Sequence, residues 1–508
     1  MTVRSSEAEI VIGIVARIGV DTKAVVADAA RILREYRYET IEIKATDAII
    51  ELEKFSDIDL SNTESRYKEL IKSCNKVREM TSLKDVMAKF AISRIIHERK
   101  AFDPDGVRLN RTAYIVNQLK RTEESDLLRS IYGEQYIQIA CHAKPGIREA
   151  RLAQKISNDN PRKPKGADWR VSARALMQID EAEEDNEWGQ RLRDVFPVSD
   201  LTIDASSDKT ILPALDRFFR ALFGDPRVTP TLDEYGMQLA RTASLRSSDL
   251  SRQVGAAIIN RFAEVQALGC NEVPRAGGGT YWEGDGGDQR EFQLGKDSND
   301  ERKREVLSDL LARLSEAGLL KAEHNDPDAL KDLIFNRADS IISDAQMMDS
   351  LEYGRTIHAE MNAITDAARG GHAVRGCILY CNTFPCHNCA KHIVASGISK
   401  VIYSMPYPKS YAEDLFSDSI CVDPDMEVSG KVVFSQFLGI SGPIFGRIFE
   451  KRKWKSRDGT VPAFSKANAT FVRKTPAPAY AQAEEIIGEE LADALAGAGL
   501  AVRRPAGL

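Results

Sequence analysis

The side chains most suited to chemistry lie in two short stretches of the C-terminal half. The sequence IHAEMN places His358 two positions before Glu360, and FPCHNC places Cys386 three positions before Cys389. Imidazole nitrogen and thiolate sulfur are ligands that zinc takes readily in proteins. The residue types therefore predict a metal site with a carboxylate beside it that could move protons.

The spacing of these residues favours a catalytic metal site over a structural one. Cys386 and Cys389 fall on the first turn of an expected helix, so both sulfurs face the same way, and the helix N-terminus favours thiolate. With His358 opening the neighbouring helix, one nitrogen and two sulfurs leave a tetrahedral position open for water. A structural Cys₄ site would need a second C-x-x-C pair, which the sequence lacks. Glu360 is close to the metal but is not a ligand.

The order H-x-E followed by P-C-x-x-C resembles the signature of the zinc-dependent nucleobase and nucleotide deaminases. The C-x-x-C pair by itself would also suit a redox site or a structural zinc site. The resemblance implies that His358, Cys386 and Cys389 bind one Zn²⁺. It also implies that Glu360 takes a proton from water and delivers it to the ring nitrogen and to the leaving ammonia.

Longer segments look like those of the deoxycytidylate deaminases, which implies a substrate-binding set. The similar segments are 251–260, 269–274, 357–364, 383–393, 400–403 and 431–438. By this resemblance Asn271 contacts the sugar hydroxyl. Thr383, Phe384 and Pro385 form a wall of the base pocket, and Arg252, Tyr407 and Lys409 are candidates for phosphate or pocket contacts. For each of the last three, a plain surface role stays open.

A long insertion, residues 275–353, interrupts this resemblance. It has three consecutive glycines near its start, at 277–279, and continues into two expected helices, near 299–317 and 326–351. An insertion of this length beside a pocket can be a lid, an effector site or an oligomer contact. Because plain deoxycytidylate deaminases have a much shorter segment here, the choice between a monophosphate and a triphosphate substrate stays open.

A second candidate site lies near the N-terminus. An expected strand over 9–15, a glycine-containing loop, a helix over 22–34 and a strand over 38–43 suit a doubly wound α/β domain. Such a domain holds phosphate at a helix N-terminus. The candidate nucleotide-binding residues are Gly13, Ala16, Ile18, Gly19, Asp21, Thr22 and Lys23.

This loop departs from the phosphate-binding pattern G-x-x-x-x-G-K-[ST]. Asp21 stands where the pattern has its last glycine, and Lys23 comes one position late. Residues 113–143 resemble the later half of a nucleotide kinase, but the strand ends in Asn117 where a magnesium-binding Asp is usual. We therefore expect a kinase-like domain without phosphoryl transfer, which serves as a scaffold or senses a nucleotide effector.

The length of 508 residues predicts two or three domains. We expect a P-loop kinase-like, doubly wound α/β domain over 1–228. It is followed by a three-layer α/β/α cytidine-deaminase-like domain with a mixed sheet over 229–450. A tail with one helix occupies 451–508.

The whole layout resembles the bacterial anti-phage deoxycytidylate/dCTP deaminases, in which a degenerate kinase-like domain precedes the deaminase. That resemblance implies depletion of the deoxycytidine nucleotide pool during infection and, for some members, inhibition by a small RNA. Single-domain relatives assemble as oligomers, so we expect a homo-oligomer.

The composition bears on the alternatives. A net charge of −6 argues against a dedicated nucleic-acid binder, and therefore against an RNA- or DNA-editing deaminase. A nucleotide- or RNA-binding regulator with a vestigial deaminase is disfavoured because all four catalytic positions are intact. No apolar run reaches the roughly 18 residues that span a bilayer, and the N-terminus is polar, so we expect a cytoplasmic protein without a membrane contact.

Overall fold

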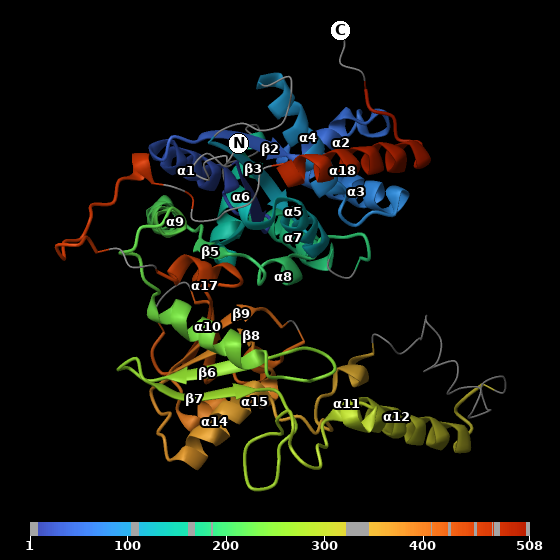
Figure 1. Cartoon of the computed structure of the whole chain (residues 1–508). Coiled ribbons are helices and arrows are strands. Elements are labelled where there is room, and N and C mark those ends of the chain that lie inside the picture. The colour runs from blue at the N-terminus through green and yellow to red at the C-terminus, as the bar shows by residue number, and fades with distance from the viewer. Residues whose placement is uncertain are drawn as a thin grey trace. The chain divides into compact units, whose positions relative to one another are not determined.

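The chain folds into two compact units in the computed structural model. The structure describes residues 9–102, 111–160, 168–183, 186–321, 345–407, 409–424, 428–451, 455–469, 471 and 478–503. The first unit comprises Met1–Tyr235 and Phe437–Leu508, and the second comprises Gly236–Gln436. Each unit is built on its own six-stranded sheet (Figure 1).

The sheet of the first unit has the order β12-β5-β4-β1-β3-β2. Its strands are β1 (Ile10–Ala16), β2 (Glu39–Lys44), β3 (Thr112–Leu119), β4 (Tyr136–His142), β5 (Leu201–Asp204) and β12 (Gly439–Ile440). All neighbours are parallel except β12, which pairs antiparallel with β5. The central strand β1 is buried along its whole length, as expected for a parallel sheet that is covered on both faces.

Helices cover both faces of this sheet, so the expected doubly wound arrangement is present. One face buries α1 (Thr22–Glu35), α9 (Asp208–Leu222) and α17 (Ile444–Phe449). The other buries α2 (Ala45–Glu51), α3 (Thr63–Thr81), α4 (Val86–Phe102), α5 (Thr122–Tyr132), α8 (Leu192–Val195) and α18 (Pro478–Gly497). A separate small cluster joins α6 (Pro145–Asp159) and α7 (Arg170–Ala182). Short 3₁₀ turns lie at Glu53–Phe55, Gly133–Gln135 and Lys466–Asn468.

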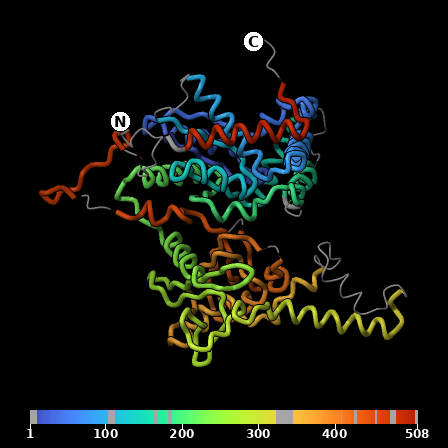
Figure 2. The backbone as a smooth tube through the Cα atoms, turned by 45° about the vertical axis from the view of Figure 1, so that its right-hand side comes forward, coloured from blue at the N-terminus to red at the C-terminus, as the bar shows by residue number. Residues whose placement is uncertain are grey.

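The C-terminal helix α18 packs into the core of the first unit, beside α4 (Figure 2). Its Glu484 forms a buried ion pair with Arg99 of α4 at 2.6 Å, and Arg99 also pairs with Glu9 at 3.1 Å. Residues 451–508 were expected to form a C-terminal tail with one helix, and α18 is a helix in that range. The described part containing α18 belongs to the first unit, because its apolar face and Glu484 are buried there.

The second unit is a three-layer structure around a mixed sheet of order β10-β11-β9-β8-β6-β7. Its strands are β6 (Gly255–Ile259), β7 (Val265–Cys270), β8 (Ile378–Thr383), β9 (Lys400–Met405), β10 (Ile420–Val422) and β11 (Val432–Gln436). β6 runs antiparallel to β7 and β8, and the others run parallel. One face carries α10 (Leu232–Ser244), and the other carries α14 (Ala359–Gly370), α15 (His387–Ser396) and α16 (Ala412–Leu415).

Successive residues of β8 illustrate the two faces. Gly236 of α10 lies so close to the ring of Tyr380 that a Cβ there would come within 2.5 Å of it. The next residue, Cys381, points to the opposite face and contacts Glu360 of α14. This alternation along β8 places the α14 and α15 helix starts on one side of the sheet.

The units differ from the expected domains at the C-terminal side. The expected second domain, 229–450, loses residues from Phe437 onward to the first unit. The cause is that Gly439 and Ile440 pair with β5, while Ile444 of α17 is buried in the core of the first unit. The boundary expected after residue 228 lies at Tyr235.

The described part of the insertion combines loops with short and long helical segments. It contains α11 (Glu291–Leu294), α12 (Ser298–Glu316) and a 3₁₀ turn at Gln346–Asp349. The helix expected near 326–351 falls largely outside the described residues. Within the part of the chain that the structure describes, no helix has the length and apolarity needed to cross a membrane.

Candidate metal and active site

The three expected metal ligands come together at the starts of two helices. His358 is the N-cap residue of α14, and Cys386 is the N-cap residue of α15. Nδ1 of His358 lies 3.2 Å from Sγ of Cys386 and 3.3 Å from Sγ of Cys389. The three ligand atoms lie within 4.8 Å of one another.

This donor set fits a zinc ion. Tetrahedral zinc bonds sulfur at about 2.3 Å and nitrogen at about 2.0 Å, which requires nitrogen–sulfur separations of about 3.5 Å. The separations in the structure are close to that value. Three protein ligands are the number found in catalytic zinc sites, where the fourth position serves water or substrate.

The pKa values of the three groups are shifted by their mutual contacts and by burial. Burial acts to lower the pKa of His358, but the neighbouring Cys386 outweighs burial and raises it to about 9. Hydrogen bonds from Cys389 and His358 outweigh burial and lower the pKa of the Cys386 thiol to about 4. Burial raises the pKa of Cys389 well above its ordinary value. A divalent cation between the three groups would favour thiolate at both cysteines.

Glu360 stands beside the ligands without belonging to them. It lies in the first turn of α14 and is 4% exposed. Its Oε2 is 3.3 Å from Sγ of Cys389, and its Oε1 accepts a hydrogen bond from the thiol of Cys381 at 3.6 Å. Burial raises the pKa of Glu360, and the negative charge of Cys386 adds to the effect. A carboxyl group in such surroundings is suited to accept and return a proton.

Strand β7 fixes the start of α14. Gly269 approaches the helix so closely that a Cβ would come within 2.2 Å of the Ala359 carbonyl. The buried side chain of Asn362 donates to the carbonyl of Cys270 at 2.9 Å. Close packing and this hydrogen bond therefore hold the helix turn that carries Glu360.

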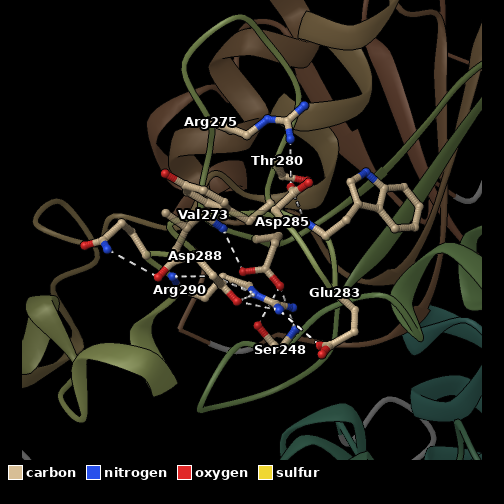
Figure 3. Close-up of polar contacts among 12 residues, drawn as sticks. Ser248, Val273, Arg275, Thr280, Glu283, Asp285, Asp288 and Arg290 are labelled. Carbon is tan, nitrogen blue, oxygen red and sulfur yellow. Dashed lines mark hydrogen bonds and ion pairs between the residues drawn. The ribbon is translucent and has the colours of Figure 1, made fainter.

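Glu272 fixes the residue before His358. Its backbone forms an antiparallel bridge with Ile357, with hydrogen bonds of 3.1 and 3.3 Å. Its buried carboxylate accepts hydrogen bonds from Ser248 N (2.9 Å) and Oγ (2.6 Å), and from Val273 N (2.9 Å) (Figure 3). Glu272 thus holds the backbone of Ile357 in place, and with it the position of His358 at the start of α14.

The start of the insertion folds back beside this strand end. Arg290 pairs with Asp288 at 2.7 Å and with Glu283 at 3.3 Å, and Arg275 pairs with Asp285 at 2.8 Å (Figure 3). These pairs order the described residues between 275 and 290.

Asn271 has both ends of its side chain engaged by the backbone. Its Oδ1 accepts from Val254 N at 2.7 Å, and its Nδ2 donates to the carbonyl of Arg252 at 2.8 Å. In this structure the residue therefore positions the chain before β6. Its expected contact with a sugar hydroxyl stays a prediction.

Residues 383–385 comprise the last residue of β8 and the turn that leads to α15. Thr383 and Pro385 are largely buried. The Phe384 ring packs edge-on against Tyr403, with centroids 4.9 Å apart, and near Phe434 at 5.5 Å. Phe384 thus has a packing role behind the cysteines, and the pocket-wall role of the three residues stays a prediction.

Arg252 and Tyr407 lie together near the ligand cysteines. The exposed guanidinium of Arg252 lies 5.7 Å from the ring centroid of Tyr407 and 3.8 Å from Sδ of Met405. Burial raises the pKa of Tyr407 and the charge of Cys386 adds to this, while Arg252 lowers it. Arg252 is therefore a cation at the edge of the metal site.

Residues at the C-terminal end of the insertion also lie in this region. Lys409 forms an ion pair with Asp349. Nε2 of His387, between the two ligand cysteines, lies 3.8 Å from Oε1 of Glu352. The charge of Lys409 is thus partly neutralised, which makes Arg252 the stronger candidate for a phosphate contact.

The N-terminal candidate residues divide into two groups. Gly13 and Ala16 belong to strand β1, which ends one residue later than the expected strand over 9–15. Gly13 is needed for packing, because a Cβ there would lie 2.5 Å from the Tyr136 hydroxyl. Gly19 has a φ of +90° and packs against Arg148. The remaining four, Ile18, Asp21, Thr22 and Lys23, line a cavity.

Three residues near the metal site carry no signal of their own in the sequence. They are Glu272, Asn362 and Cys381. Asn362 lies one helical turn after His358, a spacing that could have indicated a shared face. Cys381 could have been found from the alternation of β8, but only with the position of α14 known.

Comparisons with known proteins find similarity to deaminases in the part of the chain that contains this site. The family model described as "Cytidine and deoxycytidylate deaminase zinc-binding region" matches residues 230–405. The deoxycytidylate deaminase of Enterobacteria phage T2 is 48% identical over 54 residues, which are 11% of this chain and 29% of that protein. An uncharacterized deaminase in the luxG 3′ region of Aliivibrio fischeri is 35% identical over 117 residues, covering 22% of this chain and 72% of that protein.

A solved structure is also similar. It is the dCMP deaminase of the cyanophage S-TIM5 in complex with dCMP and dUMP, with 18% identity and a TM-score of 0.23. The match covers 41% of this chain and 98% of that chain. On the sequence matches and the family model, this chain belongs to the family of cytidine and deoxycytidylate deaminases that share the zinc-binding region.

Proposed function

We propose that this protein hydrolytically deaminates deoxycytidine nucleotides, converting dCMP, dCTP or both into dUMP or dUTP and ammonia. The observation that carries the proposal is the convergence of His358, Cys386 and Cys389 with a buried carboxylate, Glu360, beside them. Membership in the family and the deoxycytidylate deaminase of phage T2 among its relatives support the choice of substrate class.

In the proposed reaction Glu360 moves the protons. Zinc, when bound by the three ligands, would lower the pKa of water at the open position and so supply the nucleophile. Glu360 accepts a proton from the attacking water and delivers it to the ring nitrogen. It then helps transfer the second proton to the amino group, which leaves as ammonia. The bond from C4 to the exocyclic nitrogen breaks and a carbonyl forms at C4, so one water is consumed for each ammonia released.

The position of Arg252 suggests how a nucleotide would be held. Its guanidinium is exposed and lies beside Tyr407, at the edge of the metal site. A guanidinium binds phosphate oxygens through two parallel hydrogen bonds. We therefore assign Arg252 to the substrate phosphate, with Asn271 and residues 383–385 around the sugar and base.

A substrate panel tests the proposal directly. Purified full-length protein loaded with zinc would be assayed for ammonia release from dCMP, dCTP, deoxycytidine, cytidine nucleotides and single-stranded DNA and RNA. Activity on dCMP or dCTP is expected, and Arg252→Ala should raise KM much more for nucleotides than for deoxycytidine. Turnover of oligonucleotides alone would refute the proposal in favour of an editing deaminase. The absence of any turnover would favour a regulator.

On the resemblance of the whole layout, we also propose an anti-phage role. The protein would act in the cytoplasm as a homo-oligomer, deplete deoxycytidine nucleotides during infection, and be held inactive by a small RNA. Infected cells that express the wild type should lose dCMP and dCTP, whereas cells expressing Glu360→Gln should keep them. Equal nucleotide pools in the two cultures would contradict this role. Light scattering and sequencing of co-purified RNA test the oligomer and the inhibitor.

A further inference from the structure

The first unit contains a cavity of about 570 Å³ at the carboxyl ends of β1, β2 and β3. Helices α1 and α5, which follow the adjacent strands β1 and β3, are buried on opposite faces of the sheet. In doubly wound sheets, ligands bind in the crevice that forms where the connections diverge in this way. The volume is that of a pocket for a small molecule.

The walls of the cavity carry more positive than negative charge. The basic residues among those that line it are Lys23, Lys44, Arg66, Arg78, Lys120 and Lys155, and the acidic residues are Asp21, Glu124 and Asp159. Asp21 caps α1 by accepting from Ala24 N, and Glu124 pairs with Arg78 at 2.8 Å. Asp159 accepts a hydrogen bond from Thr63 N at 2.6 Å. The acidic groups are thus already engaged within the protein.

Three of the cations are available to a ligand. The side chains of Lys23, Arg66 and Lys155 are exposed, and none of them has an ion-pair partner within the described ranges of the chain. Lysine and arginine in this arrangement are typical of sites that bind phosphate groups.

Two buried amide side chains indicate that the ligand has a second part, which carries hydrogen-bond donors. Asn117 is 8% exposed and Gln190 is 7% exposed, and both line the cavity. Among the residues that the structure describes, Oδ1 of Asn117 and Oε1 of Gln190 accept no hydrogen bond, whereas Nδ2 of Asn117 donates to Glu42 at 2.8 Å. Buried acceptors without a donor are rare and costly, so a ligand that carries N–H groups would satisfy them.

The protein itself occupies the place where a phosphate loop would hold its ligand. The backbone N–H of Ile18 donates to the buried carboxylate of Asp180 at 2.9 Å, and Lys120 donates to the carbonyl of Ala16 at 2.7 Å. Asp21 adds a negative charge at the start of α1. A phosphate would therefore be bound by side chains in the cavity rather than by the loop backbone.

We propose that this cavity binds a small phosphate ester whose other end carries N–H donors, the chemistry of a nucleotide. Lys23, Arg66 and Lys155 contact the phosphates, and Asn117 and Gln190 accept hydrogen bonds from the base. The site belongs wholly to the first unit, so it is separate from the deaminase site and does not rest on the proposed deamination.

Titration calorimetry on the full-length, zinc-loaded protein tests this proposal. The probes are ATP, GTP and inorganic pyrophosphate, which are not deoxycytidine compounds and so do not report on the deaminase site. Wild type should bind at least one of the nucleotides more tightly than pyrophosphate. The double variant Lys23→Glu/Arg66→Glu should bind at least about tenfold more weakly, because each charge-assisted hydrogen bond contributes about that factor. Binding of pyrophosphate alone would reduce the site to a phosphate site and overturn the nucleotide assignment.

Matched variants locate the two ends of the ligand. Lys68→Glu, on the same helix α3 but outside the cavity lining, should bind as the wild type does. Asn117→Leu should weaken nucleotide binding while pyrophosphate binding stays unchanged. The proposal is overturned if wild type binds none of the probes, if the double variant binds like Lys68→Glu, or if Asn117→Leu affects nucleotide and pyrophosphate equally.

Discussion

The thiol of Cys381 donates a hydrogen bond to Oε1 of Glu360 over 3.6 Å. Cys381 lies on β8 and Glu360 on α14, and both side chains are almost completely buried. The contact engages one oxygen of the carboxylate, and the sulfur of Cys389 lies 3.3 Å from the other, Oε2. Cys381 is therefore a positioning residue for the proposed proton carrier.

Removing this thiol should reduce turnover without loss of the metal. We expect Cys381→Ala to lower kcat by about tenfold, the value of one hydrogen bond to a charged group, with KM little changed. Cys381→Ser, which keeps a donor, should recover part of the rate. Cys377→Ala is the matched control, since its buried thiol bonds the Ala373 carbonyl instead. A loss of zinc in Cys381→Ala would show a structural role instead.

Replacing Glu360 should separate proton transfer from metal binding. Glu360→Gln keeps the size of the side chain but cannot accept a proton, so we expect kcat to fall by at least about 10²–10⁴-fold. Zinc content, measured by elemental analysis, should stay at one per chain. Glu413→Gln, an exposed carboxylate of α16, should leave both quantities unchanged. Residual turnover near that of the wild type would refute the assigned role.

Among the cysteines and histidines of this site, only His358, Cys386 and Cys389 should be required for zinc binding. Cys389→Ala removes a fully buried ligand, so zinc should fall from one per chain to near zero, and activity should fall with it. Cys421→Ala, at a partly exposed cysteine outside the cluster, should keep its zinc. Activity of the wild type after chelation should return on addition of zinc. Full zinc in Cys389→Ala would contradict the assignment.

The buried pairing of Arg99 should matter strongly for the first unit. Arg99 is 1% exposed and serves both Glu9 and Glu484, so Arg99→Met would leave two buried carboxylates without their cation. We expect a loss of about 3–5 kcal/mol in the free energy of unfolding, measured by urea with circular dichroism. Arg94→Met on the same helix removes only exposed pairs and should cost under about 1 kcal/mol. Equal midpoints for the two variants would contradict this prediction.

Asp225 should give the first unit a pH-dependent stability. Burial acts to raise the pKa of this carboxyl group, but hydrogen bonds from Arg227 and Arg220 lower it to about 2. A lowered pKa means that the charged form stabilises the fold. The contribution, about 2 kcal/mol, is complete above about pH 5 and is lost as the pH falls through 4 toward 2. Asp225→Asn should therefore be less stable than wild type at pH 6, and the difference should shrink as the pH falls over that window. A difference that stays constant with pH would contradict the assignment.

Several features followed from the sequence because they depend on local structure. The spacing of Cys386 and Cys389 predicts that their sulfurs meet, since one helical turn sets their separation. The strand, loop and helix order near the N-terminus predicts a doubly wound sheet, which the structure contains. The role of Gly13 was harder to predict: it lies within β1, and a Cβ at this position would collide with the Tyr136 hydroxyl.

Other features were decided only by the tertiary structure, because they join residues far apart in the chain. The pairing of β12 with β5 and the burial of Glu484 against Arg99 return the C-terminal segment to the first unit. No local sequence pattern predicts these contacts. They depend on whether the edge of the sheet at β5 and the buried cation Arg99 can accept a partner from the C-terminal segment. The sequence by itself determined the four residues expected to carry the chemistry. Only the tertiary structure showed that Cys381 and Glu272 lie beside these four residues. The alternation of β8 directs Cys381 toward Glu360, and the bridge to Ile357 places Glu272 next to His358.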